Sequence, residues 1–211
     1  MKIKICGLFR GEDIDYVNEA RPDYAGFLFA QSRRNVSPGQ AARMRRRLSD
    51  AIVPVGVFVN APIEVIASLY RDGVITAAQL HGNEDDEYII RLKEASERGG
   101  QKSMLIIKTL KSDELEAGKT TASNSDCYLI DSGAGSGRAF NWEILDPRKA
   151  RWDSGGKPWF LAGGIGLENI EKAITFKPFA MDISSGAETD GKKNREKIIQ
   201  LTTIVRRADK L

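Results

Sequence analysis

The feature that most constrains the fold is a repeated alternation of short apolar segments with helical patterns along the 211 residues. Short apolar runs bounded by polar or glycine-containing turns indicate buried β-strands. The eight candidate strands are residues 1–8, 24–29, 52–59, 76–80, 103–108, 126–130, 159–162 and 179–183. Strands that alternate with helices predict a parallel sheet, and eight such units predict an α/β fold, the (β/α)8 TIM barrel. We expect a single compact domain over residues 1–211.

Helical patterns fill the intervals between these strands. Ser37 and Pro38 have the residue types that start a helix, and the acidic residues 84–87 are expected in a first turn, where they suit the helix dipole. The predicted helices are residues 13–20, 37–48, 62–71, a segment from 84 onward, 112–117, 167–175 and 194–208, with a helical turn at 141–145. An open doubly wound sheet is the alternative, but no Gly-x-Gly-x-x-Gly turn follows the first strand.

Charge and hydropathy exclude two classes of partner. The formal net charge of +3 is too small to imply a nucleic-acid partner, and no apolar run of about 18 residues indicates a membrane span. The basic run at 43–47 is better explained as the solvated face of a helix with Ala41, Met44 and Leu48 on its apolar side.

The cysteine and histidine content limits the chemistry further. Two cysteines, Cys6 and Cys127, form no disulfide framework, which favours a reduced, cytoplasmic protein. The single histidine, His81, excludes a His-rich zinc site. A Ser-His-Asp triad would have to use His81, and no Gly-x-Ser-x-Gly elbow accompanies it.

Polar and reactive side chains recur where the predicted strands end. A closed barrel would bring these residues into one ring, where barrel enzymes bind their ligands. The ring comprises Cys6, Arg34, Asn60, His81, Lys108, Asp131, Gly163, Gly164, Asp182, Ser184 and Ser185. Each residue alone could simply mark the start of a polar loop, and Cys6 could be a small buried hydrophobic residue. These explanations account less well for the presence of a thiol, a carboxylate and a guanidinium together on one rim.

The last two loops of the ring have the composition of a phosphate site. Gly163-Gly164-Ile165 and Ser184-Ser185-Gly186 follow the seventh and eighth predicted strands, the usual place for phosphate in this fold. Glycine allows an anion to approach backbone N–H groups closely, and serine adds a hydroxyl donor. We therefore expect a small phosphorylated substrate, with ordinary turn chemistry as the alternative.

Five segments together resemble the phosphoribosylanthranilate isomerase family. They are Lys4-Ile5-Cys6-Gly7, Gly56-Val57-Phe58-Val59-Asn60, Gln79-Leu80-His81-Gly82, Leu161-Ala162-Gly163-Gly164-Ile165 and Asp182-Ile183-Ser184-Ser185-Gly186. The resemblance covers essentially the whole chain. It implies a (β/α)8 barrel that uses no cofactor and no metal. The implied reaction is the Amadori rearrangement of N-(5-phosphoribosyl)anthranilate to the 1-deoxyribulose 5-phosphate derivative, in tryptophan biosynthesis.

The resemblance also implies roles for particular residues. Cys6 would be the general base and Asp131 the general acid, and Arg34 would hold the anthranilate carboxylate. The Gly164 and Ser185 loops would hold the phosphate. These roles suit the chemistry, because ring opening needs a proton donor and the Schiff base that follows acidifies the neighbouring C2 hydrogen. Asp131 must hold its proton until it acts.

The substrate-binding set that we predict is Arg34, His81, Gly163, Gly164, Ile165, Asp182, Ser184, Ser185 and Gly186. For His81 we favour a polar wall of the pocket over an ion pair with Cys6. The loop after Asp131 departs from the family pattern, although Phe140 and Trp142 are kept.

Two other functions are compatible with a barrel of this kind. One is another phosphosugar enzyme such as indole-3-glycerol phosphate synthase, although a cysteine on the first strand does not suit that chemistry. The other is a barrel that binds a phosphosugar or anthranilate ligand without catalysis, because fold alone does not settle function. The expected partner is a small molecule, with no nucleic acid and no membrane, and the chain could be a monomer or a homodimer.

Overall fold

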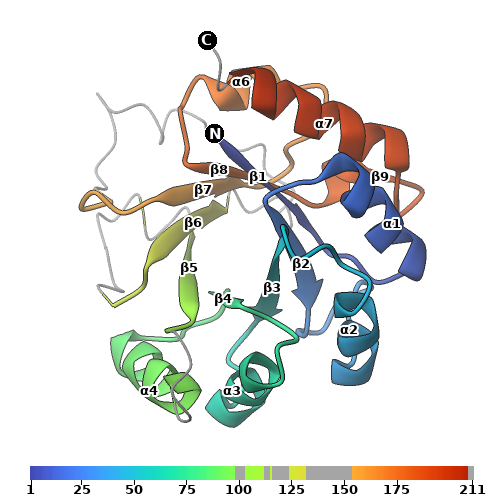
Figure 1. Cartoon of the computed structure of the whole chain (residues 1–211). Coiled ribbons are helices and arrows are strands. Elements are labelled where there is room, and N and C mark those ends of the chain that lie inside the picture. The colour runs from blue at the N-terminus through green and yellow to red at the C-terminus, as the bar shows by residue number, and fades with distance from the viewer. Residues whose placement is uncertain (98–102, 112–114, 116–123, 132–153, 209–211) are drawn as a thin grey trace.

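Eight parallel strands close into a barrel in the computed structural model, with each strand hydrogen-bonded to the next and β8 to β1 (Figure 1). The structure describes residues 1–97, 103–111, 115, 124–131 and 154–208. The strands are β1 (Lys2–Cys6), β2 (Tyr24–Leu28), β3 (Val53–Phe58), β4 (Ala77–Leu80), β5 (Leu105–Lys111), β6 (Cys127–Asp131), β7 (Trp159–Ala162) and β8 (Ala180–Ile183). The predicted (β/α)8 barrel is therefore confirmed, and the open sheet is wrong.

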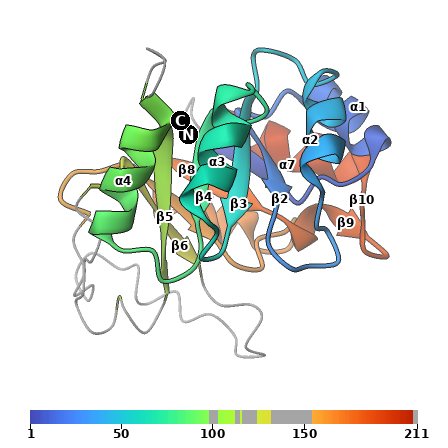
Figure 2. The ribbon, with the colours of Figure 1, turned by 90° about the horizontal axis from the view of Figure 1, so that it is seen from below.

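Helices surround the barrel, with α3 beside α4 and α1 beside α7 (Figures 1 and 2). The described helices are α1 (Gly11–Ala20), α2 (Pro38–Arg45), α3 (Ile63–Arg71), α4 (Asp86–Glu97), α6 (Ile170–Ile174), α7 (Arg195–Ala208) and the short 3-10 helix η3 (Ser185–Ala187). Apart from Leu115, the helix expected at 112–117 lies outside the described residues, as does the turn at 141–145. In the described part of the chain, no helix is long and apolar enough to cross a membrane.

Two helices, α4 and α6, begin later in the chain than predicted, because side-chain hydrogen bonds hold the preceding residues outside the helix. α4 begins at Asp86 because the Asp85 carboxylate accepts the backbone N–H of Tyr88 and caps the helix. Glu84 was expected in that first turn, but it lies before the helix and is buried. α6 begins only at Ile170, because the side chain of Asn169 holds the preceding residues in a turn through its hydrogen bonds to Gly166 and Gly164.

A two-stranded hairpin after β8 was missed by the sequence analysis. It consists of β9 (Glu188–Thr189) and β10 (Lys192–Lys193), joined by Asp190-Gly191. Both turn residues have positive φ angles, 50° and 75°. Asp-Gly is a strong hairpin signal because its residues tolerate this conformation, so the sequence did contain the information.

The side chains of β1 alternate between two buried layers. Ile3 and Ile5 pack into the apolar layer between barrel and helices, so Lys4 and Cys6 point to the barrel interior. Cys127 belongs to a second apolar cluster formed by strand residues alone. The barrel interior therefore contains both this apolar cluster and the buried side chains of Lys4 and Cys6.

The basic run at 43–47 lies on α2 and its C-terminal turn, as predicted. Ala41, Met44 and Leu48 are buried, whereas Arg45 and Arg47 form ion pairs with acidic residues on the exposed side. Surface pairs of this kind contribute little to stability, and the run lies on a solvated helix face.

Candidate active site

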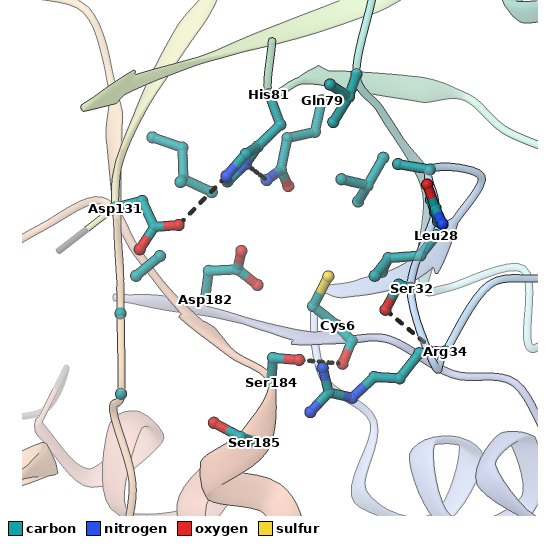
Figure 3. A pocket seen from close by; sticks show the side chains of 18 residues that line it. Cys6, Leu28, Ser32, Arg34, Gln79, His81, Asp131, Asp182, Ser184 and Ser185 are labelled. Atoms are coloured by element: carbon teal, nitrogen blue, oxygen red, sulfur yellow. Dashed lines mark hydrogen bonds and ion pairs between the residues drawn. The ribbon is translucent and has the colours of Figure 1, made fainter. Parts of the chain in front are cut away.

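A cavity of about 360 Å³ opens at the carboxyl ends of the strands (Figure 3). It brings together residues from seven of the eight strands or the loops after them. The predicted site residues that line it are Cys6, Arg34, His81, Asp131, Gly163, Gly164, Asp182, Ser184 and Ser185. Leu28, Val57, Val59, Leu129 and Ala162 add an apolar part to the wall. The cavity thus combines a reactive polar side with a surface suited to an aromatic ring.

Two predicted site residues, Ile165 and Gly186, are not among the residues that line this cavity. Ile165 is buried, and a Cβ on Gly186 would lie 1.9 Å from the carbonyl oxygen of Ile165. No side chain can be placed at that distance, so Gly186 lets the β8 loop pack directly on the β7 loop.

Lys108, another residue of the predicted ring, does not line the cavity. Its Nζ donates to the Gly82 carbonyl and the Glu84 carboxylate.

Cys6 ends β1 with its sulfur directed into the cavity (Figure 3). Its partner in the β1–β2 register is Gly26, where a Cβ would lie only 2.7 Å from Sγ. Glycine on β2 therefore makes room for the thiol. Burial raises the pKa of Cys6, and the Lys4 ammonium acts against this rise. The thiol is placed to lose a proton beside a fixed positive charge.

Lys4 lies beneath Cys6 with its side chain completely buried. Its Nζ donates to both carboxylate oxygens of Asp182, at 3.0 and 2.9 Å, and to Oε1 of Gln79 at 2.7 Å. An unpaired buried ammonium would cost several kcal/mol, so these acceptors hold the charge in place. Sequence reasoning missed the role of Lys4. The sequence did contain a signal, because both faces of a barrel strand are covered and a lysine within such a strand must be buried and needs partners.

Arg34 reaches the cavity from the loop after β2 and is held by a residue of the β9–β10 hairpin. Its Nε and Nη2 donate to the two carboxylate oxygens of Glu188, at 2.6 and 2.8 Å. Burial acts to raise the pKa of Glu188, but hydrogen bonds from Arg34 and Lys193 outweigh it and hold that pKa at about 2. The Arg34 stem also lies over Gly7, where a Cβ would be 2.6 Å from Cδ. This anchoring leaves donors on Nη1 for a ligand.

His81 and Asp131 meet at another side of the cavity from Cys6 (Figure 3). The distance from His81 Nε2 to Asp131 Oδ2 is 3.3 Å. The other ring nitrogen, Nδ1, lies 3.3 Å from Gln79 Nε2 and 3.1 Å from Thr109 Oγ1. The sequence analysis considered Cys6 as a partner of His81 and did not consider Asp131. Among the described residues, no group of three or more His, Cys, Asp or Glu side chains is placed to hold a metal ion.

Comparison with known proteins agrees with the resemblance carried by the five segments. Residues 3–203 match the family described as N-(5'-phosphoribosyl)anthranilate (PRA) isomerase. The chain belongs to this isomerase family. The N-(5'-phosphoribosyl)anthranilate isomerase of Endomicrobium trichonymphae is 41% identical over 208 residues, which cover 97% of this chain and 98% of that protein. The protein of the same name from Clostridium acetobutylicum is 38% identical, with 98% of each chain covered.

Solved isomerase structures share the barrel. Phosphoribosyl anthranilate isomerase from Thermus thermophilus superposes with a TM-score of 0.77 at 30% identity, covering 98% of this chain and 99% of that one. A second isomerase was solved in complex with reduced 1-(o-carboxyphenylamino)-1-deoxyribulose 5-phosphate, and it superposes with a TM-score of 0.75 at 30% identity, covering 98% of each chain. The bound compound in that second structure carries a phosphate and a carboxyphenyl group at opposite ends.

Proposed function

We propose that this chain carries out the Amadori rearrangement of N-(5-phosphoribosyl)anthranilate, with Cys6 as general base and Asp131 as general acid. The observation that carries this assignment of roles is that a thiol and a carboxyl group face one cavity from different strands. Membership of the isomerase family supplies the reaction. Cys6 and Asp131 supply the two proton-transfer groups that the reaction needs.

Two proton transfers, one from Asp131 and one to Cys6, begin the proposed chemistry. Asp131 gives its proton to the ring oxygen of the ribose as the bond between C1 and that oxygen breaks, and the anilino nitrogen forms a double bond to C1. The Cys6 thiolate then removes the proton from C2, and the electron pair of that bond moves toward the iminium nitrogen. The product is an enaminol, which becomes the ketone when C1 gains a proton and the C2 hydroxyl loses one. Lys4 stabilises the thiolate from beneath.

The two ends of the substrate would be held at separate parts of the cavity. We assign the phosphate to the loops around Gly164 and Ser185, where positive φ angles of 96° and 65° at Gly163 and Gly164 require glycine. We assign the anthranilate carboxylate to Arg34, whose planar guanidinium suits a carboxylate. Ser184 donates to the carbonyl oxygen of Cys6, so this loop is tied to the strand end that carries the base.

We expect Arg34→Ala to raise KM at least ~10-fold, because a charge-assisted hydrogen bond to the substrate is worth about 1.5–3 kcal/mol. Arg33→Ala is the matched control. Arg33 also binds Glu188, but its side chain is 60% exposed whereas that of Arg34 is 15% exposed, and only Arg34 lines the cavity. Steady-state kinetics of both variants would check this. Equal and small effects would end the assignment of Arg34.

Inorganic phosphate should inhibit competitively, because it would occupy the place of the substrate phosphate. Gly164→Val should weaken both substrate and phosphate binding, since φ is 65° at this position and a branched side chain there is strained. Gly155→Val is the matched control, because Gly155 also has a positive φ of 60° but lies outside the cavity. Inhibition constants for phosphate would be compared among the three proteins. Competition that survives Gly164→Val unchanged would place the phosphate elsewhere.

The two alternative functions are not favoured by the family comparison, and one assay separates them from the proposal. Substrate generated in situ from anthranilate should be consumed and converted to the rearranged product. An indole-3-glycerol phosphate synthase or a non-catalytic binding protein would leave this substrate without isomerisation. We also propose a cytoplasmic location, which rests on the cysteine content alone, and we keep a monomer and a homodimer as the two candidate states.

A further inference from the structure

His81 lies between Gln79 and Asp131 (Figure 3), in a line of hydrogen-bonding groups that begins at Lys4 in the barrel interior. Lys4 Nζ lies 2.7 Å from Gln79 Oε1, and Gln79 Nε2 lies 3.3 Å from His81 Nδ1. His81 Nε2 lies 3.3 Å from Asp131 Oδ2. Gln79 is 3% exposed and Lys4 is not exposed. Water therefore has little access to the inner part of this line.

The first group in the line fixes the direction of every hydrogen bond after it. Burial acts to lower the pKa of Lys4, but Asp182 outweighs it and the pKa is raised, so the ammonium has donors only. Gln79 must therefore turn its carbonyl oxygen to Lys4 and its NH2 group to His81. An amide NH2 group can only donate, so Nδ1 of His81 must accept. The proton of the neutral imidazole is then on Nε2, which faces Asp131.

We propose that Lys4 and Gln79 hold His81 in the Nε2–H tautomer, and that His81 is the positioning residue for the acid Asp131. This inference rests on the proposed function for the role of Asp131. His81 donates to Oδ2, so the proton that Asp131 delivers to the substrate is carried by Oδ1. When Asp131 has lost that proton, the N–H of His81 remains hydrogen-bonded to the new carboxylate. His81 thus orients the acid and stabilises its conjugate base without exchanging a proton.

The test is the ¹⁵N NMR spectrum of the full chain labelled at histidine and prepared without an affinity tag. His81 is the single histidine, so both imidazole signals belong to it. At mildly alkaline pH we expect a protonated Nε2 and an unprotonated Nδ1. A proton on Nδ1, whether as the other tautomer or as an imidazolium, would overturn the inference. The result does not depend on catalysis, so it is distinct from a failure of Asp131 as the acid.

Variants of Gln79 test whether this side chain fixes the tautomer. Gln79→Glu keeps an acceptor for Lys4 but offers His81 an acceptor instead of a donor, so the proton should appear on Nδ1. Gln79→Met is a second variant, for use if the buried glutamate of Gln79→Glu prevents folding. Methionine has a similar volume but no donor, so it should give a mixture of tautomers. Thr109→Val is the matched control. It removes the other neighbour of Nδ1 and should leave the Nε2–H tautomer unchanged. A wild-type spectrum in both Gln79 variants would contradict the proposal.

Discussion

Asp131→Asn is expected to lower kcat by at least ~10²-fold, in line with the usual contribution of one general acid. Asparagine keeps the shape of the side chain and can still accept the N–H of His81, but it has no acidic proton for the ring oxygen. The ring then opens only with a proton from water. Steady-state kinetics with substrate generated in situ would measure the loss, and thermal unfolding would show that the barrel is intact.

Asp50→Asn is the matched control for this variant. It makes the same chemical change at a carboxylate that is 93% exposed and pairs with Arg45 on the surface. Its kcat should equal that of the wild type. An Asp131→Asn enzyme with near wild-type kcat would show that the proton comes from another group.

Cys6→Ser is expected to lower kcat by a similar factor of at least ~10². The variant replaces the thiol with a hydroxyl that is hardly ionised at any pH at which the enzyme folds. Cys127→Ser is the matched control, because Cys127 is also buried in the barrel but does not line the cavity. Any loss of stability from a buried hydroxyl would appear in both variants, whereas the loss of the base would appear only in Cys6→Ser. A Cys6→Ser enzyme with a near wild-type rate would show that Cys6 serves only in packing and is not the base.

The pH dependence follows from the same assignment. Burial raises the pKa of Cys6, so the thiolate fraction keeps growing to a higher pH than for a free thiol. The productive form needs a thiolate beside a protonated acid, and a carboxyl group ordinarily ionises at a lower pH than a thiol. The decline of kcat/KM on the alkaline side should therefore follow the Cys6 thiol and lie above the ordinary thiol range. The two limbs give macroscopic constants of the coupled site. The thiol-dependent decline should be absent from Cys6→Ser.

The strands could be predicted from the sequence because their apolar runs are short and bounded by polar residues. The starts of α4 and α6 could not be predicted closely, since single side chains decide them. Asp85 caps α4 while its neighbour Glu84 turns inward to accept from Gly82 and Lys108. Nothing in the run of four acidic residues distinguishes the two. That difference appears only when the packing around Asn60 and Gly82 is known.

The candidate site was predicted as a ring of strand ends, and most of that ring lines the cavity. What the sequence could not provide were the contacts that orient it. Lys4 meets Asp182 because β1 and β8 pair in one particular register, and Arg34 meets Glu188 because a hairpin follows β8. Both contacts join residues more than 150 positions apart in the chain. Only the closed topology brings these residues together.

The central claim is that Cys6 and Asp131 act at different steps, and deuterium at C2 of the ribose tests it most directly. Rates with C2-deuterated and ordinary substrate would be compared in the wild type, Cys6→Ser and Asp131→Asn. We predict a larger isotope effect in Cys6→Ser than in the wild type, because removal of the C2 proton becomes limiting. Asp131→Asn should show an effect no larger than the wild type, because ring opening limits it. Equal isotope effects in the two variants would contradict the division of roles.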